Sequence, residues 1–162
     1  MQNNIVLIVI FALATILFGC DGDEGAAINI SNNVLISVLN AKGEDLLDPE
    51  HPSAIDLSQI KVYYELNGVK TEINRPNLDF PQEYRLEEPN SNLDYYRIYL
   101  FLNTEDSSNP TVTYFEWNPE EVDVFESTLI RSGGSIHNDK IWLNDELVCD
   151  GGGDCELTKI MD

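Results

Sequence analysis

The chain of 162 residues is strongly acidic, with 29 Asp and Glu against 9 Lys and Arg and a formal net charge of −20. This balance argues against nucleic-acid binding, which needs Lys and Arg to neutralise phosphates, and against adsorption of the protein surface to anionic lipid. The length suits one domain with its own hydrophobic core.

The first part of the chain is apolar and uncharged. Residues 5–18 are apolar except for Thr15, and the run closes with Leu17-Phe18-Gly19-Cys20. A membrane-spanning helix needs roughly 20 apolar residues, so this shorter run better matches the apolar region of a secretory signal. The segment resembles the signal peptide and lipobox of bacterial lipoproteins, which implies removal of residues 1–19 and a lipid anchor on Cys20. The alternatives are a buried N-terminal helix and an uncleaved anchor.

An acidic stretch follows Cys20. Small and charged residues without apolar anchors predict a flexible tether over residues 20–29. Asp21-Gly22-Asp23-Glu24-Gly25 resembles the export signal of Bacteroidetes surface lipoproteins, which implies an outer-membrane protein displayed at the cell surface. If the stretch is only a generic tether, the domain could instead remain on the periplasmic face.

Residues 30–162 are expected to form one mainly β domain, an antiparallel sandwich of the immunoglobulin-like or a related type. Asn67-Gly68 and Asn144-Asp145 each predict a two-residue hairpin. Residues 119–131 fit a helix, because Asn118 and Pro119 form a good helix start, or a strand, because β-branched residues recur there; a strand is favoured. The expected strands are residues 34–39, 60–66, 69–73, 95–102, 111–117, the two arms of 140–149, and 156–161.

Two cysteines remain once Cys20 is assigned to lipid. In an oxidising compartment Cys149 and Cys155 are expected to form a disulfide across a glycine-rich turn. A regular hairpin about Asn144-Asp145 would place Cys149 opposite Lys140, on the face that carries Trp142. Asp150 and Asp154 in the same turn are candidate calcium ligands, although Asp-Gly clusters are also ordinary turn chemistry.

The sequence has no Gly-x-Ser-x-Gly, His-Glu-x-x-His, P-loop or dinucleotide fingerprint. No catalytic residue and no cofactor are therefore expected. Tyr95, Tyr99 and Phe101 share one face of the strand at 95–102. This face is a candidate binding platform for a glycan or a protein; the alternative is that these rings fill the core.

Three segments, residues 40–49 (NAKGEDLLDP), 113–117 (TYFEW) and 141–145 (IWLND), resemble a family of uncharacterised Bacteroidetes lipoproteins. The resemblance supplies no activity and no ligand. The expected function is a lipid-anchored, non-enzymatic binding or accessory module for a glycan or a protein of the cell envelope. The alternatives are a structural subunit of an envelope assembly and, less favoured, a hydrolase.

Overall fold

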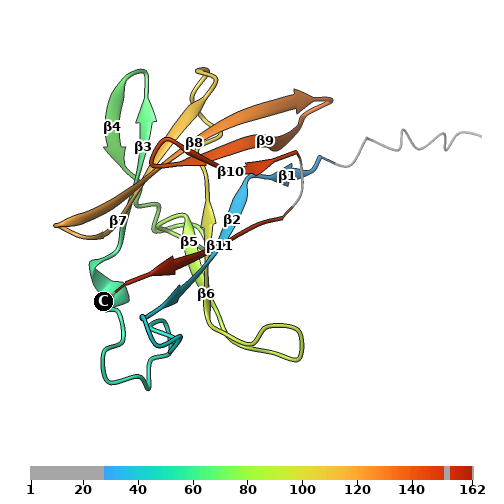
Figure 1. The fold of residues 1–162 in the computed structure, drawn as a ribbon. Coiled ribbons are helices and arrows are strands. Elements are labelled where there is room, and N and C mark those ends of the chain that lie inside the picture. Colours follow the sequence, from blue (N-terminus) through green and yellow to red (C-terminus); the bar gives the residue numbers. More distant parts are fainter. Residues whose placement is uncertain (1–27, 152–153, 162) are drawn as a thin grey trace, which may run out of the picture.

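The computed structural model describes residues 28–151 and 154–161. Over these residues the protein is mainly β, with two sheets packed against each other around one apolar core and a short 3₁₀ helix, η2 (Leu57–Gln59). Figure 1 shows the two layers and the strands that compose them. The two-sheet sandwich expected from the sequence is confirmed. The expected signal peptide and the lipidation site Cys20 lie outside the described residues.

The larger sheet has seven strands and the smaller has four. Along the large sheet the strands are β1 (Ile30–Ser31), β9 (Ser135–Leu143), β8 (Glu121–Ser132), β7 (Thr111–Asn118), β3 (Lys61–Leu66) and β4 (Val69–Glu72), with β10 (Glu146–Asp150) also paired to β9. Along the small sheet they are β11 (Cys155–Ile160), β2 (Asn33–Leu39), β6 (Arg97–Phe101) and β5 (Tyr84–Glu87).

Both sheets are mixed, which corrects the expectation of purely antiparallel pairing. β1 runs parallel to β9. β11 runs parallel to β2, from Cys155 opposite Val34 to Ile160 opposite Leu39. Parallel neighbours cannot be joined by a tight hairpin. β2 and β11 are accordingly far apart in the sequence, with β3 to β10 between them. No local sequence signal marks such a pairing.

The two predicted hairpins are confirmed. Asn67 and Gly68 have φ of 52° and 77° and join β3 to β4. Asn144 and Asp145, with φ of 51° and 69°, join β9 to β10. Asn, Asp and Gly tolerate this left-handed backbone better than other residues do. The ambiguous segment at 119–131 contributes to the long strand β8, as favoured.

The core lies between the two inner faces. In β6, Ile98 and Leu100 are fully buried and point inward. In β7, Phe115 and Trp117 are buried and their rings meet edge to face, with centroids 4.6 Å apart. Such pairs add to the stabilisation from apolar burial. The alternation of buried and half-exposed residues in both strands leaves every second side chain on an outer face.

Cys149 and Cys155 form the expected disulfide, with Cα atoms 6.0 Å apart. The register of β10 shifts between Leu147 and Cys149, so Cys149 pairs with the buried Ile141 and not with Lys140. The expected regular register is confirmed for Glu146 and Leu147 and is wrong from Cys149 onward. A β-bulge at this point turns Cys149 from the Trp142 face toward the core, where it can reach β11. The bond thus connects the large sheet to the small one.

Candidate functional site

The outer face of the small sheet carries a group of side chains that we call the aromatic–arginine cluster: Phe80, Arg85, Tyr99 and Phe101. Tyr99 and Phe101 have ring centroids 5.0 Å apart, and Phe80 stacks on Phe101 at 5.7 Å. The guanidinium carbon of Arg85 lies 4.4 Å from the Tyr99 ring centroid and 5.1 Å from that of Phe80. Both distances fall within the range of cation–π attraction.

Two neighbouring strands place this cluster. Because Ile98 and Leu100 face the core, Tyr99 and Phe101 in β6 face outward and are half-exposed. Arg85 in β5 stands directly opposite Tyr99 in the register. Arg85 also forms an ion pair with Glu87, two residues along the same face.

The cluster combines apolar surface with a neutral hydroxyl and a fixed cation. Burial raises the pKa of Tyr99, so its phenol stays protonated at physiological pH and can donate a hydrogen bond. The guanidinium of Arg85 presents several N–H donors in a planar arrangement. The cluster can therefore offer a partner apolar contact, a hydrogen-bond donor and a positive charge.

The structure brings together two of the three predicted platform residues. Tyr95 lies in the bend before β6, with 39% of its surface exposed. Within residues 28–151 and 154–161, the aromatic and cation–π contacts do not include Tyr95. Sequence reasoning missed Phe80 and Arg85. The alternation of apolar and charged residues in Tyr84-Arg85-Leu86-Glu87 is the period-two signal that would have identified β5.

A second pair of aromatic rings lies on the outer face of the large sheet. Tyr63 and Tyr114 face each other across β3 and β7. The amine of Lys70 lies 4.3 and 4.7 Å from their ring centroids, and the hydroxyl of Tyr114 donates to a carboxylate oxygen of Glu65 at 2.9 Å. These two rings are thus already engaged with side chains of the protein itself.

The two candidate calcium ligands lie in or next to strands of different sheets. Asp150 ends β10 and forms an ion pair with Lys140 at 3.4 Å, whereas Asp154 directly precedes β11. In the part of the chain that the structure describes, no group of three or more His, Cys, Asp or Glu side chains is arranged to hold a metal ion.

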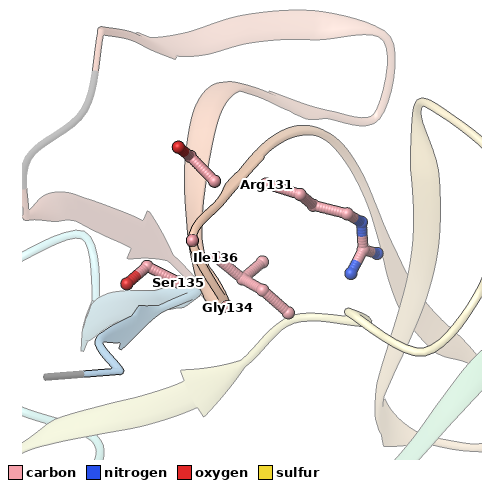
Figure 2. Close-up of a pocket in the computed structure, with 6 residues that line it drawn as sticks. Arg131, Gly134, Ser135 and Ile136 are labelled. Carbon is pink, nitrogen blue, oxygen red and sulfur yellow. The ribbon is translucent and has the colours of Figure 1, made fainter. Parts of the chain in front are cut away.

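A hollow of about 300 Å³ surrounds the turn between β8 and β9. Figure 2 shows its lining, in which Arg131 extends away from the glycine turn toward the neighbouring loop. There Arg131 donates to the carbonyl oxygens of Thr104 and Asp106 at 2.8 and 3.2 Å. The described residues that line this hollow include no aromatic ring, so it offers less apolar surface for recognition than the aromatic–arginine cluster.

Comparison with protein-family models, with curated proteins and with solved structures finds no match to this chain. Among the described residues, no helix is long and apolar enough to cross a membrane.

Proposed function

We propose that this protein is a lipid-anchored, non-enzymatic binding module of the bacterial cell envelope, and that its ligand, a protein or a glycan, docks on the aromatic–arginine cluster. The observation that carries the proposal is the position of Arg85, Tyr99 and Phe101 on an outer sheet face, away from the core that their neighbours fill. A fold gains nothing in core packing from rings in this position. Their exposed area is, however, available to a partner.

The composition of the cluster favours a protein over a glycan as the ligand at this face. Tyr and Arg are the residue types that most often dominate binding energy at protein interfaces. The guanidinium of Arg85 contacts the rings of both Phe80 and Tyr99, so its side chain is partly ordered before a partner arrives. Ordering in advance reduces the entropy lost on binding.

The proposal places the domain outside the cytoplasm, held by acyl chains on Cys20 in the outer membrane and facing the cell surface. The disulfide between Cys149 and Cys155 supports an oxidising compartment. The apolar run and the lipobox-like segment that precede the domain support the anchor.

The fold assignment within this proposal is an immunoglobulin-like or related sandwich. Two packed sheets and the buried Trp117 support it. The parallel pairs β1–β9 and β2–β11 are its distinguishing features.

The docking face is tested by cross-linking the native lipoprotein in cells, identifying the partner, and titrating purified partner against purified variants. Removal of Arg85 or Tyr99 by substitution with Ala is expected to weaken binding by about tenfold or more, the loss typical of an interface hot spot. Tyr63→Ala, which removes a half-exposed ring from the opposite sheet, is the matched control and should bind like the wild type. Equal affinities for all three variants would show that the ligand does not bind at this face.

The anchor is tested by the intact mass of the native protein and by protease treatment of whole cells. Wild type is expected to lack residues 1–19, to carry acyl chains and to be cleaved by external protease. Cys20→Ala should lose the acyl chains. Retention of residues 1–19 without acylation would contradict the anchor, whereas lipidation with protection from protease would place the domain on the periplasmic face.

A further inference from the structure

The outer face of the large sheet has a hollow of about 370 Å³ that the proposed function does not use. Its lining comprises Pro110, Glu126, Trp142 and Asp145. The volume lies at the lower end of the roughly 300–1,000 Å³ typical of small-ligand sites.

Two adjacent strands form the floor of the hollow. Glu126 in β8 and Trp142 in β9 stand directly opposite each other in the register. The chain neighbours of Glu126, Phe125 and Ser127, are buried, so Glu126 points to the outer face. Trp142 is likewise half-exposed beside the buried Ile141. An indole and a carboxylate therefore lie side by side on a rigid sheet.

The other two lining residues, Pro110 and Asp145, form the rims of the hollow. Each follows an asparagine that is hydrogen-bonded to β8. Asn109, which precedes Pro110, accepts the backbone N–H of Leu129 on its side-chain oxygen at 3.0 Å. Asn144, which precedes Asp145, accepts the backbone N–H of Val124 on its side-chain oxygen at 2.9 Å. The positions of Pro110 and Asp145 are thus determined by asparagines that are hydrogen-bonded to β8.

The Asp145 rim has further support from inside the sandwich. The side-chain amide of Asn144 donates to Asp123 at 3.0 Å. Asp123, only 5% exposed, also accepts from the indole of Trp117 at 2.7 Å and from the amine of Lys159 at 3.0 Å. These hydrogen bonds tie the turn to the buried carboxylate of Asp123. A site whose polar groups are held in place before binding loses less entropy when a ligand arrives.

From this arrangement we propose that the hollow binds a neutral sugar ring. The indole face of Trp142 and the ring of Pro110 offer apolar surface to the C–H faces of a sugar, and the carboxylates of Glu126 and Asp145 offer charged acceptors to its hydroxyl groups. Hydrogen bonds to charged groups are the stronger class. The two carboxylates, in a chain of net charge −20, repel phosphate, sulfate and uronate groups, which disfavours anionic glycans.

The probes are maltotriose, cellotriose, mannotriose and chitotriose, each titrated calorimetrically against the full chain in a detergent without a sugar head group. The protein has two tryptophans, and Trp117 is buried. Binding is therefore expected to change the fluorescence of Trp142. Trp142→Ala should abolish both the fluorescence change and the heat of binding.

Two conservative variants test the carboxylates without removing side-chain volume. Glu126→Gln and Asp145→Asn are each expected to weaken binding by about tenfold, the effect of losing one charged hydrogen-bond acceptor. Asn tolerates the left-handed backbone at position 145, so this turn should persist. Glu116→Gln, on the same outer face in β7 but outside the hollow, is the matched control and should leave affinity unchanged.

Several results would overturn the proposal. They are the absence of saturable binding of all four trisaccharides, binding that survives Trp142→Ala, and binding of a lysine amide probe in place of the sugars. This site and the aromatic–arginine cluster lie on opposite outer faces, so failure here leaves the proposed docking face untouched.

Discussion

Asn103 is a buried residue that stabilises the connection between the two sheets. It is fully buried just after β6, where the chain leaves the small sheet for the large one. Its side-chain amide donates to the carbonyl oxygens of Glu65 and Val112 at 2.9 and 3.2 Å, and its oxygen accepts the N–H of Glu105 at 2.9 Å. The side chain therefore satisfies part-buried backbone groups that would otherwise lack these partners.

Asn103→Ala is expected to lower the free energy of unfolding by about 3 kcal/mol, because several part-buried backbone groups lose their partner at once. Denaturant unfolding of the variant measures this loss. The control is Asn92→Ala at an exposed position whose backbone N–H, not its side chain, makes the turn hydrogen bond; it should change stability by less than about 0.5 kcal/mol. Equal losses in both variants would contradict the role assigned to Asn103.

At the level of elements, β10 and β11 belong to different sheets and are joined covalently by Cys149 and Cys155. Their replacement by Ala in a double variant is expected to cost about 2 kcal/mol of unfolding free energy, the loop-closure contribution for so short a loop. Denaturant unfolding with and without reductant measures it. Reductant should destabilise the wild type and leave the double variant unchanged; a wild type insensitive to reductant would contradict the estimate.

The elements also show which parts of the fold were accessible from sequence. Asn67-Gly68 and Asn144-Asp145 determine turn geometry by their own backbone preferences, so their hairpins were predictable. The bulge before Cys149 was not, because it follows from the need to reach a partner in the other sheet. The partnership of Arg85 with Tyr99 was missed for a similar reason, since it depends on β5 and β6 lying side by side across an irregular loop.

For the whole molecule, titration of buried groups predicts a loss of stability in alkali. Burial alone would lower the pKa of Lys159, but its hydrogen bonds to Glu121 and Asp123 raise that pKa overall. Burial raises the pKa of Tyr64, whose hydroxyl donates to the carbonyl oxygen of Phe101 at 3.1 Å. Both groups hold their protons more tightly when folded than unfolded. Their contribution is therefore complete below the unfolded pKa values of about 10 and is lost as pH rises above them.

The free energy of unfolding is thus expected to fall above about pH 10, with each group adding up to about 1.4 kcal/mol per pH unit. Unfolding curves collected from neutral to alkaline pH measure the slope. Tyr64→Phe removes one of the two titrations and should give a shallower decline. An unchanged slope in this variant would rule out Tyr64 as a source of the alkaline sensitivity.

The parallel strands have a mechanical consequence. Tension applied through the chain before Ile28 reaches β1 first, and β1 pairs with β9 over only two residues. Once β1 has detached, the load passes to β2, which is hydrogen-bonded to β6 on one side and to β11 on the other. The disulfide of β11 then transmits the load into the large sheet through a covalent bond. A domain pulled from its N-terminal end would therefore release β1 first, while β2 stays held between β6 and β11.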